Sequence, residues 1–295
     1  GYMNSTLILK GNILYTPRPS EFISIQHGYI IAVDGVVVYC GESIPPAYAE
    51  CEVTDYGDNL IIPGFVDTHA HAPQYCNRGL GMDKELLPWL ETYTFPEEAK
   101  FSDPDYARLV YGAFVQDLWR NGTTRSILFG TIHKESTLVL MELLQKAGLS
   151  AYVGKVNMDR NSPDFLIEET SQSLADTKDW LEESVPFGPL VKPIITPRFV
   201  PSCTSELMSG LGKLAEEYNV PIQSHLSENH GEIDWVAALH PESPNYTDVY
   251  YEHKLMGRTP TVMAHCIHLS DEEMDRMAET QTMVSHCPYS NVNLS

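Results

Sequence analysis

The chain has 295 residues, 43% of them hydrophobic and 20% charged, so it can bury a sizeable core and is neither disordered nor of low complexity. Its 40 acidic and 19 basic residues give a formal net charge of −21. This charge would repel phosphate backbones and anionic lipids, which excludes nucleic acid and membrane surfaces as favoured partners and points to a small-molecule substrate.

The first sixty residues predict a small β unit. Short apolar runs at residues 7–9, 22–25, 29–33 and 36–40 are separated by Gly, Pro, Asn and Asp, which favour turns. We therefore expect hairpins in an antiparallel sheet, and we place a small β domain at residues 1–62.

From residue 61 the pattern changes to apolar runs that alternate with helical segments. Seven runs have the character of strands, at residues 65–71, 123–129, 151–157, 191–199, 220–225, 261–265 and 282–286. Strands that alternate with helices predict parallel β/α units, so we place a second domain at residues 63–295.

Helix ends can be recognised between these runs. Asp103, followed by a proline, is a predicted N-cap. Ser136 is predicted to open a helix that Gly148 stops, and Ser270 and Glu273 have the spacing of a capping box. The signals place helices in the connections between strands, as β/α units require.

The six cysteines form no C-x-x-C pair, so a disulfide framework or a thiolate zinc site is not expected. The sequence shows no signal peptide and no apolar run long enough to span a membrane. We therefore expect free thiols in a cytoplasmic protein.

The sequence motifs do not support three common classes of nucleotide-binding or hydrolytic protein. The sequence contains neither G-x-x-x-x-G-K-[ST] nor G-x-S-x-G, which disfavours a P-loop NTPase and an α/β-hydrolase. Residues 210–215 (GLGKLA) superficially match a dinucleotide fingerprint, but they lie inside a helical pattern, so we expect no nucleotide there.

Histidines end several of the predicted strands. His69 and His71 are two residues apart on one strand, so both side chains point to the same face and could bind one metal ion. His225, His265 and His286 each end another run. In a parallel barrel these ends converge on one rim, where active sites occur. A histidine pair alone is as readily polar surface or core, so the convergence carries the prediction.

The other histidines give weaker signals. His133 follows a strand closely and is a candidate to line the site, with a structural role as the alternative. A surface position is the preferred interpretation for the remaining five, His27, His230, His240, His253 and His268.

Two charged residues complete the candidate chemistry. Glu228 lies three residues beyond His225, where a carboxylate could take a proton from a metal-activated water and return it to the substrate; a solvated loop acid is the alternative. Arg198 ends another run and could hold an acceptor atom of the substrate, or form an ion pair with one of the forty carboxylates.

These residues lie in segments that resemble a known family. Residues 63–71 (PGFVDTHAH) are similar to the first barrel strand of the metal-dependent amidohydrolase superfamily. Within it, the chain resembles the guanine deaminases through five ordered segments: HAPQY at 71–75, WLETYTFPEE at 89–98, TPRF at 196–199, SHLSEN at 224–229 and SHCPYSN at 285–291. The similarity runs from about residue 59 to the end.

The resemblance implies an α/β fold, a (β/α)8 TIM-type barrel of the amidohydrolase type with a small N-terminal β-sandwich domain. It also implies zinc-dependent hydrolysis of guanine to xanthine and ammonia. His69, His71 and His225 would ligate one zinc ion, with iron as a possible substitute because imidazole suits both metals. Zinc-bound hydroxide would attack the ring carbon that bears the amino group, and Glu228 would shuttle the protons. His265 would orient the water or stabilise the tetrahedral intermediate.

The same resemblance implies how the purine is held. Gln74, Arg198 and Phe199 would bind it, together with His225 and Glu228. A role in the core is the alternative to a role in the pocket for three nearby aromatic residues, Trp89, Tyr93 and Phe95.

The chain departs from the family at one position. The family's fourth metal ligand is an Asp at the end of the eighth strand, and no residue up to Ser295 corresponds to it. We therefore expect an incomplete barrel of seven strands and a fragment of a longer protein. A homodimer is the expected assembly, because barrels of this family are often homodimers. Two alternatives stay open: an amidohydrolase that deaminates another aminopurine or amino-heterocycle, and a non-catalytic module that binds a purine or a metal.

Overall fold

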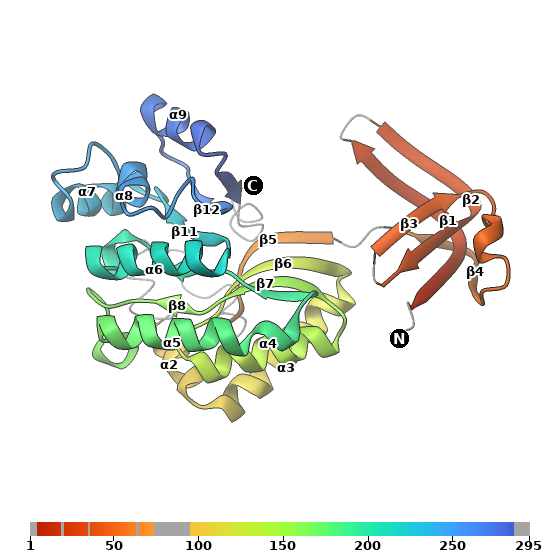
Figure 1. Ribbon diagram of the computed structural model, residues 1–295, viewed down its shortest axis with the longest axis horizontal. Coiled ribbons are helices and arrows are strands. Elements are labelled where there is room, and N and C mark those ends of the chain that lie inside the picture. The colour runs from red at the N-terminus through yellow and green to blue at the C-terminus, as the bar shows by residue number, and fades with distance from the viewer. Residues whose placement is uncertain (1–4, 19–20, 35, 63–64, 74–94, 286–295) are drawn as a thin grey trace. The chain divides into compact units, whose positions relative to one another are not determined.

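The computed structural model describes residues 5–18, 21–34, 36–62, 65–73 and 95–285 (Figure 1). The chain divides into two compact units, Gly1–Gly64 and Phe65–Ser295. The domain limits expected from the sequence, residues 1–62 and 63–295, remain a prediction. Among the described residues, no helix combines the length and the apolar character needed to cross a membrane.

The first unit is a four-stranded sheet. Its strands are β1 (Thr6–Arg18), β2 (Glu21–Val33), β3 (Val36–Gly41) and β4 (Val53–Ile61), in the order β3-β2-β1-β4. The pairs β1–β2 and β2–β3 are antiparallel, as expected. The expectation of a purely antiparallel unit was wrong, because β4 pairs with β1 in parallel.

Two predicted runs of the first unit belong to one strand. Residues 22–25 and 29–33 both lie in β2, which continues past His27 although the φ angle there is +50°. The backbone N–H of His27 donates to the Asn12 side-chain oxygen at 3.0 Å, next to the register shift between Gly11 and Ile13. A β-bulge therefore replaces the turn that the sequence indicates.

The second unit contains strands in all seven predicted runs. They are β5 (Phe65–His71), β6 (Thr123–Phe129), β7 (Ser150–Gly154) with β8 (Val156–Asn157), β9 (Val191–Pro193) with β10 (Thr196–Pro197), β11 (Ile222–Leu226), β12 (Thr261–His265) and β13 (Met283–Ser285). Every strand pair of this unit is parallel. Neighbouring strands follow the order of the chain, and an isolated parallel bridge joins Ile195, between β9 and β10, to Ile222 of β11.

The third and fourth runs are each divided into two short strands. At the first division a Cβ atom on Gly154 would lie only 1.8 Å from the Thr196 hydroxyl. The absence of a side chain at Gly154 thus permits the close approach of the two neighbouring runs.

Helices connect the strands of the second unit. They are α2 (Phe95–Ala99), α3 (Pro104–Arg120), α4 (Lys134–Lys146), α5 (Thr170–Glu183), α6 (Ser205–Tyr218), α7 (His230–Leu239), α8 (Tyr246–Glu252) and α9 (Asp271–Glu279). Figure 1 shows α3, α4, α5 and α6 lying along the strands. The core between these layers includes the fully buried side chains of Leu140, Trp180, Leu211 and Met263.

Most of the predicted helix ends are confirmed. Asp103 caps α3, accepting a hydrogen bond from the Asp105 backbone N–H, and Ser270 and Glu273 form the expected capping box of α9. The predicted start of α4 at Ser136 was wrong, because α4 begins at Lys134. The Ser136 hydroxyl instead donates to the carbonyl oxygen of Phe101 and is buried.

The described cysteines are free, as expected: Cys40, Cys51, Cys203 and Cys266. The GLGKLA segment lies inside α6, which confirms that it is not a strand-to-helix turn. Because all strands of the second unit run in one direction, their carboxyl ends lie at one edge, and the candidate site is found there.

Candidate active site

Aromatic rings from four strand ends cluster at this edge. The His71 ring lies 4.6 Å from Phe129 and 4.9 Å from His225, measured between ring centroids. Phe129 is 4.5 Å from His225, and His225 is 5.4 Å from His265. The strands β5, β6, β11 and β12 therefore bring together three of the histidines that the sequence placed at strand ends.

Hydrogen bonding fixes the orientation of the His225 ring. Its Nδ1 atom lies 2.7 Å from the carbonyl oxygen of Arg198. A carbonyl oxygen only accepts, so Nδ1 carries the proton and Nε2 of the neutral ring has a free electron pair. This is the arrangement by which metal-binding histidines are commonly oriented.

The spacing of His71 and His225 fits a shared metal ion. Their Nε2 atoms are 2.9 Å apart. Two nitrogens bound to one tetrahedral zinc ion at ~2.0–2.1 Å would be roughly 3.3 Å apart, which is similar. Because Nε2 of His225 is the acceptor, Nε2–H of His71 donates the hydrogen bond between the two rings. The donor set is therefore suitable for zinc.

The third expected ligand, His69, lies on β5, but its side chain is outside the described residues. Among the side chains that are described, no group of three His, Cys, Asp or Glu residues is arranged to hold a metal. The set of three histidine ligands thus remains a prediction, and the structure places two of them, His71 and His225, next to each other.

Glu228 and His265 lie beside the imidazole cluster. His265 Nε2 is 3.6 Å from Glu228 Oε2. The pKa of Glu228 is raised to about 7, because burial disfavours the charged carboxylate, while Arg198 acts in the opposite direction. A carboxyl group with this pKa can both accept and donate a proton near neutral pH.

The backbone around these two residues is strained. Ser227, His265 and Cys266 have φ angles of +52°, +77° and +52°, in the left-handed region that residues other than glycine rarely adopt. The N–H of Cys266 donates to the Leu226 carbonyl at 2.8 Å, and the N–H of Ile267 to Ser227 at 3.2 Å. Hydrogen bonds between the two loops thus stabilise conformations that are costly on their own.

Arg198 forms a buried ion pair, which was one of the two interpretations of the sequence. Its Nη1 atom lies 2.9 and 2.8 Å from the two carboxylate oxygens of Glu98. The guanidinium carbon is 5.3 Å from the centre of the Phe95 ring. Among the described residues, Nη2 and Nε of Arg198 have no hydrogen-bond partner, so the ion pair leaves donors for a ligand.

Phe199 and Phe95 are both buried. The Phe199 ring lies edge-on to Trp235 of α7, with 6.2 Å between ring centroids. Phe95 begins α2 and lies under Arg198. Gln74 of the predicted purine site lies outside the described residues, as do Trp89, Tyr93 and His286.

His133 precedes α4 and makes no ring contact with the three clustered imidazoles among the described residues. Its Nε2 atom is buried without a hydrogen-bond partner in that part of the chain. Burial, with a smaller contribution from the charge of Lys155, lowers the pKa of His133 to about 4. His240, expected at the surface, is 3% exposed and contacts Arg160 and Glu242, so that expectation was wrong.

Sequence reasoning missed two residues at this site, Glu98 and Phe129. Glu98 lies in the quoted segment at residues 89–98, but nothing in that segment identifies which carboxylate pairs with Arg198. Phe129 ends a predicted strand, as the histidines do, and this position at a strand end could have identified it as a residue of the site.

The chain is similar to proteins of a known family. Residues 60–295 match the model of the amidohydrolase family. The guanine deaminase of Dictyostelium discoideum is 52% identical over 244 residues, which cover 82% of this chain and 54% of that protein. The chain thus spans about half the length of this relative.

Two solved structures have the same fold. The crystal structure of guanine deaminase from C. acetobutylicum with bound guanine in the active site has a TM-score of 0.93 and 51% identity, covering 98% of this chain and 69% of that one. An adenosine deaminase from Xanthomonas campestris with bound zinc has a TM-score of 0.79 at 20% identity, covering 98% and 64%. At this lower identity the likeness shows the fold alone.

Proposed function

Since the chain belongs to the amidohydrolase family, we propose that it carries the greater part of a guanine deaminase active site, which converts guanine and water into xanthine and ammonia. The observation that carries this proposal is the placement of His71 and His225 with their Nε2 atoms 2.9 Å apart, beside Glu228 and His265. The 51% identity to a structure with guanine in its active site supports the choice of substrate.

His69, His71 and His225 would hold one divalent metal ion, with zinc favoured and iron a possible substitute. Such an ion acts as a Lewis acid and lowers the pKa of a coordinated water to about 7. The orientation of His225 by the Arg198 carbonyl supports this ligand assignment.

Glu228 would move the protons. As a carboxylate it accepts a proton from the attacking water, and as a carboxylic acid it gives that proton to the ring nitrogen next to the amino-bearing carbon. Glu228 would then accept the second proton from the added oxygen and give it to the amino group, so that the carbon–nitrogen bond breaks, ammonia leaves and the carbon–oxygen bond becomes a carbonyl of xanthine. His265, 3.6 Å from Glu228, is positioned to orient the water.

Arg198, Phe199 and Gln74 would bind the purine, together with His225 and Glu228. Arg198 has donors on Nη2 and Nε for acceptor atoms of guanine, since only Nη1 is used by Glu98. Phe199 offers a buried aromatic surface next to these donors. Guanine has both acceptor atoms and an apolar ring face, so these groups suit it.

The finer architecture belongs to the same proposal. We expect a (β/α)8 barrel of which this chain provides seven strands, and a first sheet that is part of a small β-sandwich. The parallel pairing of β5 to β13 in chain order supports the barrel. A homodimer is the expected assembly, to be measured by light scattering.

The test is an assay of the full-length, zinc-loaded protein with guanine, recording xanthine by absorbance and ammonia by a coupled enzyme. We expect equal amounts of the two products. Adenine and an aminotriazine are run in parallel. Turnover of either one without turnover of guanine would refute the substrate, and binding of guanine by calorimetry without any product would refute the catalytic role.

A further inference from the structure

A second buried carboxylate lies behind Glu228. Glu232 is 1% exposed, and among the described residues no Lys, Arg or His nitrogen lies within 4 Å of it. Its Oε2 atom accepts the backbone N–H of Glu228 at 3.0 Å, and its Oε1 atom accepts the Tyr246 hydroxyl at 2.5 Å. A buried acid without a cation is costly unless hydrogen bonds compensate it, so these two bonds are the main reason that Glu232 is tolerated.

Tyr246 belongs to a helix that also contacts the backbone of His225. Tyr246 and Tyr250 lie one turn apart on α8, and the Tyr250 hydroxyl donates to the His225 carbonyl at 2.6 Å. Both tyrosines are buried. We call Glu232, Tyr246 and Tyr250 the Glu232 network. It connects α8 with the backbone of a proposed metal ligand and with the backbone of the proposed proton shuttle.

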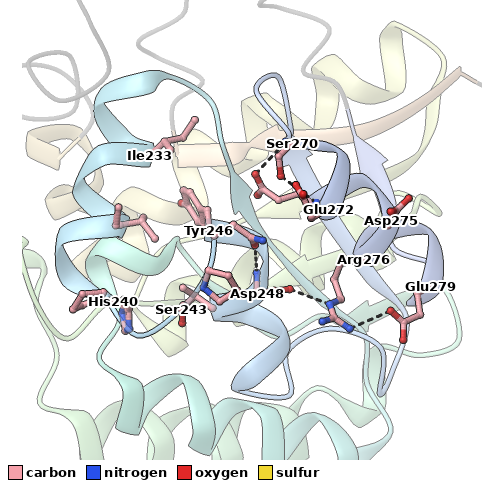
Figure 2. Close-up of a pocket in the computed structure, with 17 residues that line it drawn as sticks. Ile233, His240, Ser243, Tyr246, Asp248, Ser270, Glu272, Asp275, Arg276 and Glu279 are labelled. Atoms are coloured by element: carbon pink, nitrogen blue, oxygen red, sulfur yellow. Dashed lines mark hydrogen bonds and ion pairs between the residues drawn. The ribbon is translucent and has the colours of Figure 1, made fainter.

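The helix that carries the tyrosines is held on its other side by α9. Arg276 of α9 donates to Asp248 of α8 at 2.9 Å, and Figure 2 shows this contact in the groove between α7, α8 and α9 that Tyr246 helps to line. Glu273 accepts the Thr247 hydroxyl at 2.5 Å. Because α8 is fixed to α9, the Tyr246 hydroxyl has a defined position from which to hold Glu232.

The loop held in this way is the strained one. Ser227, directly before Glu228, has a φ angle of +52°. A residue other than glycine keeps such a conformation only where its surroundings impose it. The Glu228 N–H is the first backbone donor after this residue, and Glu232 is its acceptor. The bond therefore fixes the direction in which the Glu228 side chain leaves the loop.

We infer that Glu232 is a positioning residue for the deamination: held by Tyr246, it fixes the turn that aims the Glu228 carboxyl at the reacting atoms. This inference rests on the proposed function. It assigns Glu232 no contact with guanine or metal, so its loss affects the chemical step more than binding.

The test compares four single variants and the Glu232→Gln/Tyr246→Phe double variant of the full-length, zinc-loaded protein. Glu232→Gln replaces one of the two acceptor oxygens with an NH2 donor, and Tyr246→Phe removes the hydroxyl that donates to Glu232. Asp234→Asn and Tyr251→Phe are matched controls on the same two helices, since Asp234 and Tyr251 are exposed and outside the network. For each protein, kcat and KM for guanine are measured, and amide hydrogen exchange is measured for the peptide that contains Glu228.

We expect kcat to fall about 10- to 100-fold in Glu232→Gln and in Tyr246→Phe, the range found for residues that orient catalytic groups, with KM changed much less. The double variant should lose less than the product of the two single losses, because both act through one network. Exchange at the Glu228 amide should become faster in both variants and stay unchanged in the two controls.

Wild-type kcat and wild-type exchange in Glu232→Gln would overturn the inference, as would equal losses in the controls. If Glu232→Gln fails to fold, Tyr246→Phe decides by the same two measurements. If the wild-type protein itself releases no ammonia from guanine, the proposed function fails, while the exchange data still show whether Glu232 holds the Glu228 loop.

Discussion

Removal of the Glu98 carboxylate tests the ion pair that holds Arg198. The two side chains are 1% and 4% exposed, and both oxygens of Glu98 lie within 2.9 Å of Arg198 Nη1. In Glu98→Ala the guanidinium stays buried without its counter-charge. Breaking a buried pair in this way costs about 3–5 kcal/mol of unfolding free energy. For a unit of this size, that corresponds to a fall in Tm of about 6–20 °C.

The assay is urea unfolding of wild type, Glu98→Ala and a matched control, Glu183→Gln. Glu183 pairs with Lys134 at 3.1 Å, but its side chain is 50% exposed, so the control should change stability by less than about 1 kcal/mol. Glu98→Ala should also raise KM for guanine, because Arg198 is no longer aimed. If the two variants unfold at the same urea concentration, the ion pair does not fix Arg198 and the reasoning is refuted.

Three further predictions follow from the site. His71→Ala and His225→Ala should each lose bound zinc in elemental analysis, and full occupancy in both would show that the ligand assignment is wrong. Glu228→Gln should keep its zinc and lose about 10²–10⁴-fold in kcat, so a variant with wild-type kcat would remove Glu228 from the mechanism. The raised pKa of Glu228 also predicts a pH-dependent stability. The folded protein binds more protons than the unfolded chain between the ordinary carboxyl pKa of 4.5 and about 7. This contribution to stability is therefore fully present below pH 4.5 and is lost as pH rises through 7. In urea unfolding of the metal-free protein, wild type should therefore lose stability relative to Glu228→Gln between pH 4.5 and 7.5. The loss is at most about 3 kcal/mol, and it is smaller than this limit because 31% of the Glu228 side chain is exposed. Parallel stability curves for the two proteins would contradict the raised pKa of Glu228.

The sequence predicts the second unit well because its signals are local. The strands lie in short runs that contain apolar or β-branched residues and alternate with helical segments, and Phe65–His71, Thr123–Phe129 and Thr261–His265 have the bounds expected. The meeting of His71 and His225 follows from one further rule, that parallel strands end at the same edge. By contrast, β4 (VTDYGDNLI) contains Asp, Gly and Asn and is largely exposed, so it has no alternating pattern by which it could be recognised.

The residues that hold the candidate catalytic groups could not be predicted in the same way. Glu98 is 100 positions from Arg198 and is one of 40 acidic residues, so no local pattern selects it. Glu232 lies four residues from Glu228, but its role depends on Tyr246, which only the packing of α7 against α8 brings near. Side chains at strand ends are positioned by the parallel pairing of the strands. The residues that hydrogen-bond to them lie on helices, and the packing of these helices depends on the whole core. Substitutions at Glu98, Glu232 and Tyr246 therefore test the tertiary structure of the site, and substitutions at His71, His225 and Glu228 test its chemistry.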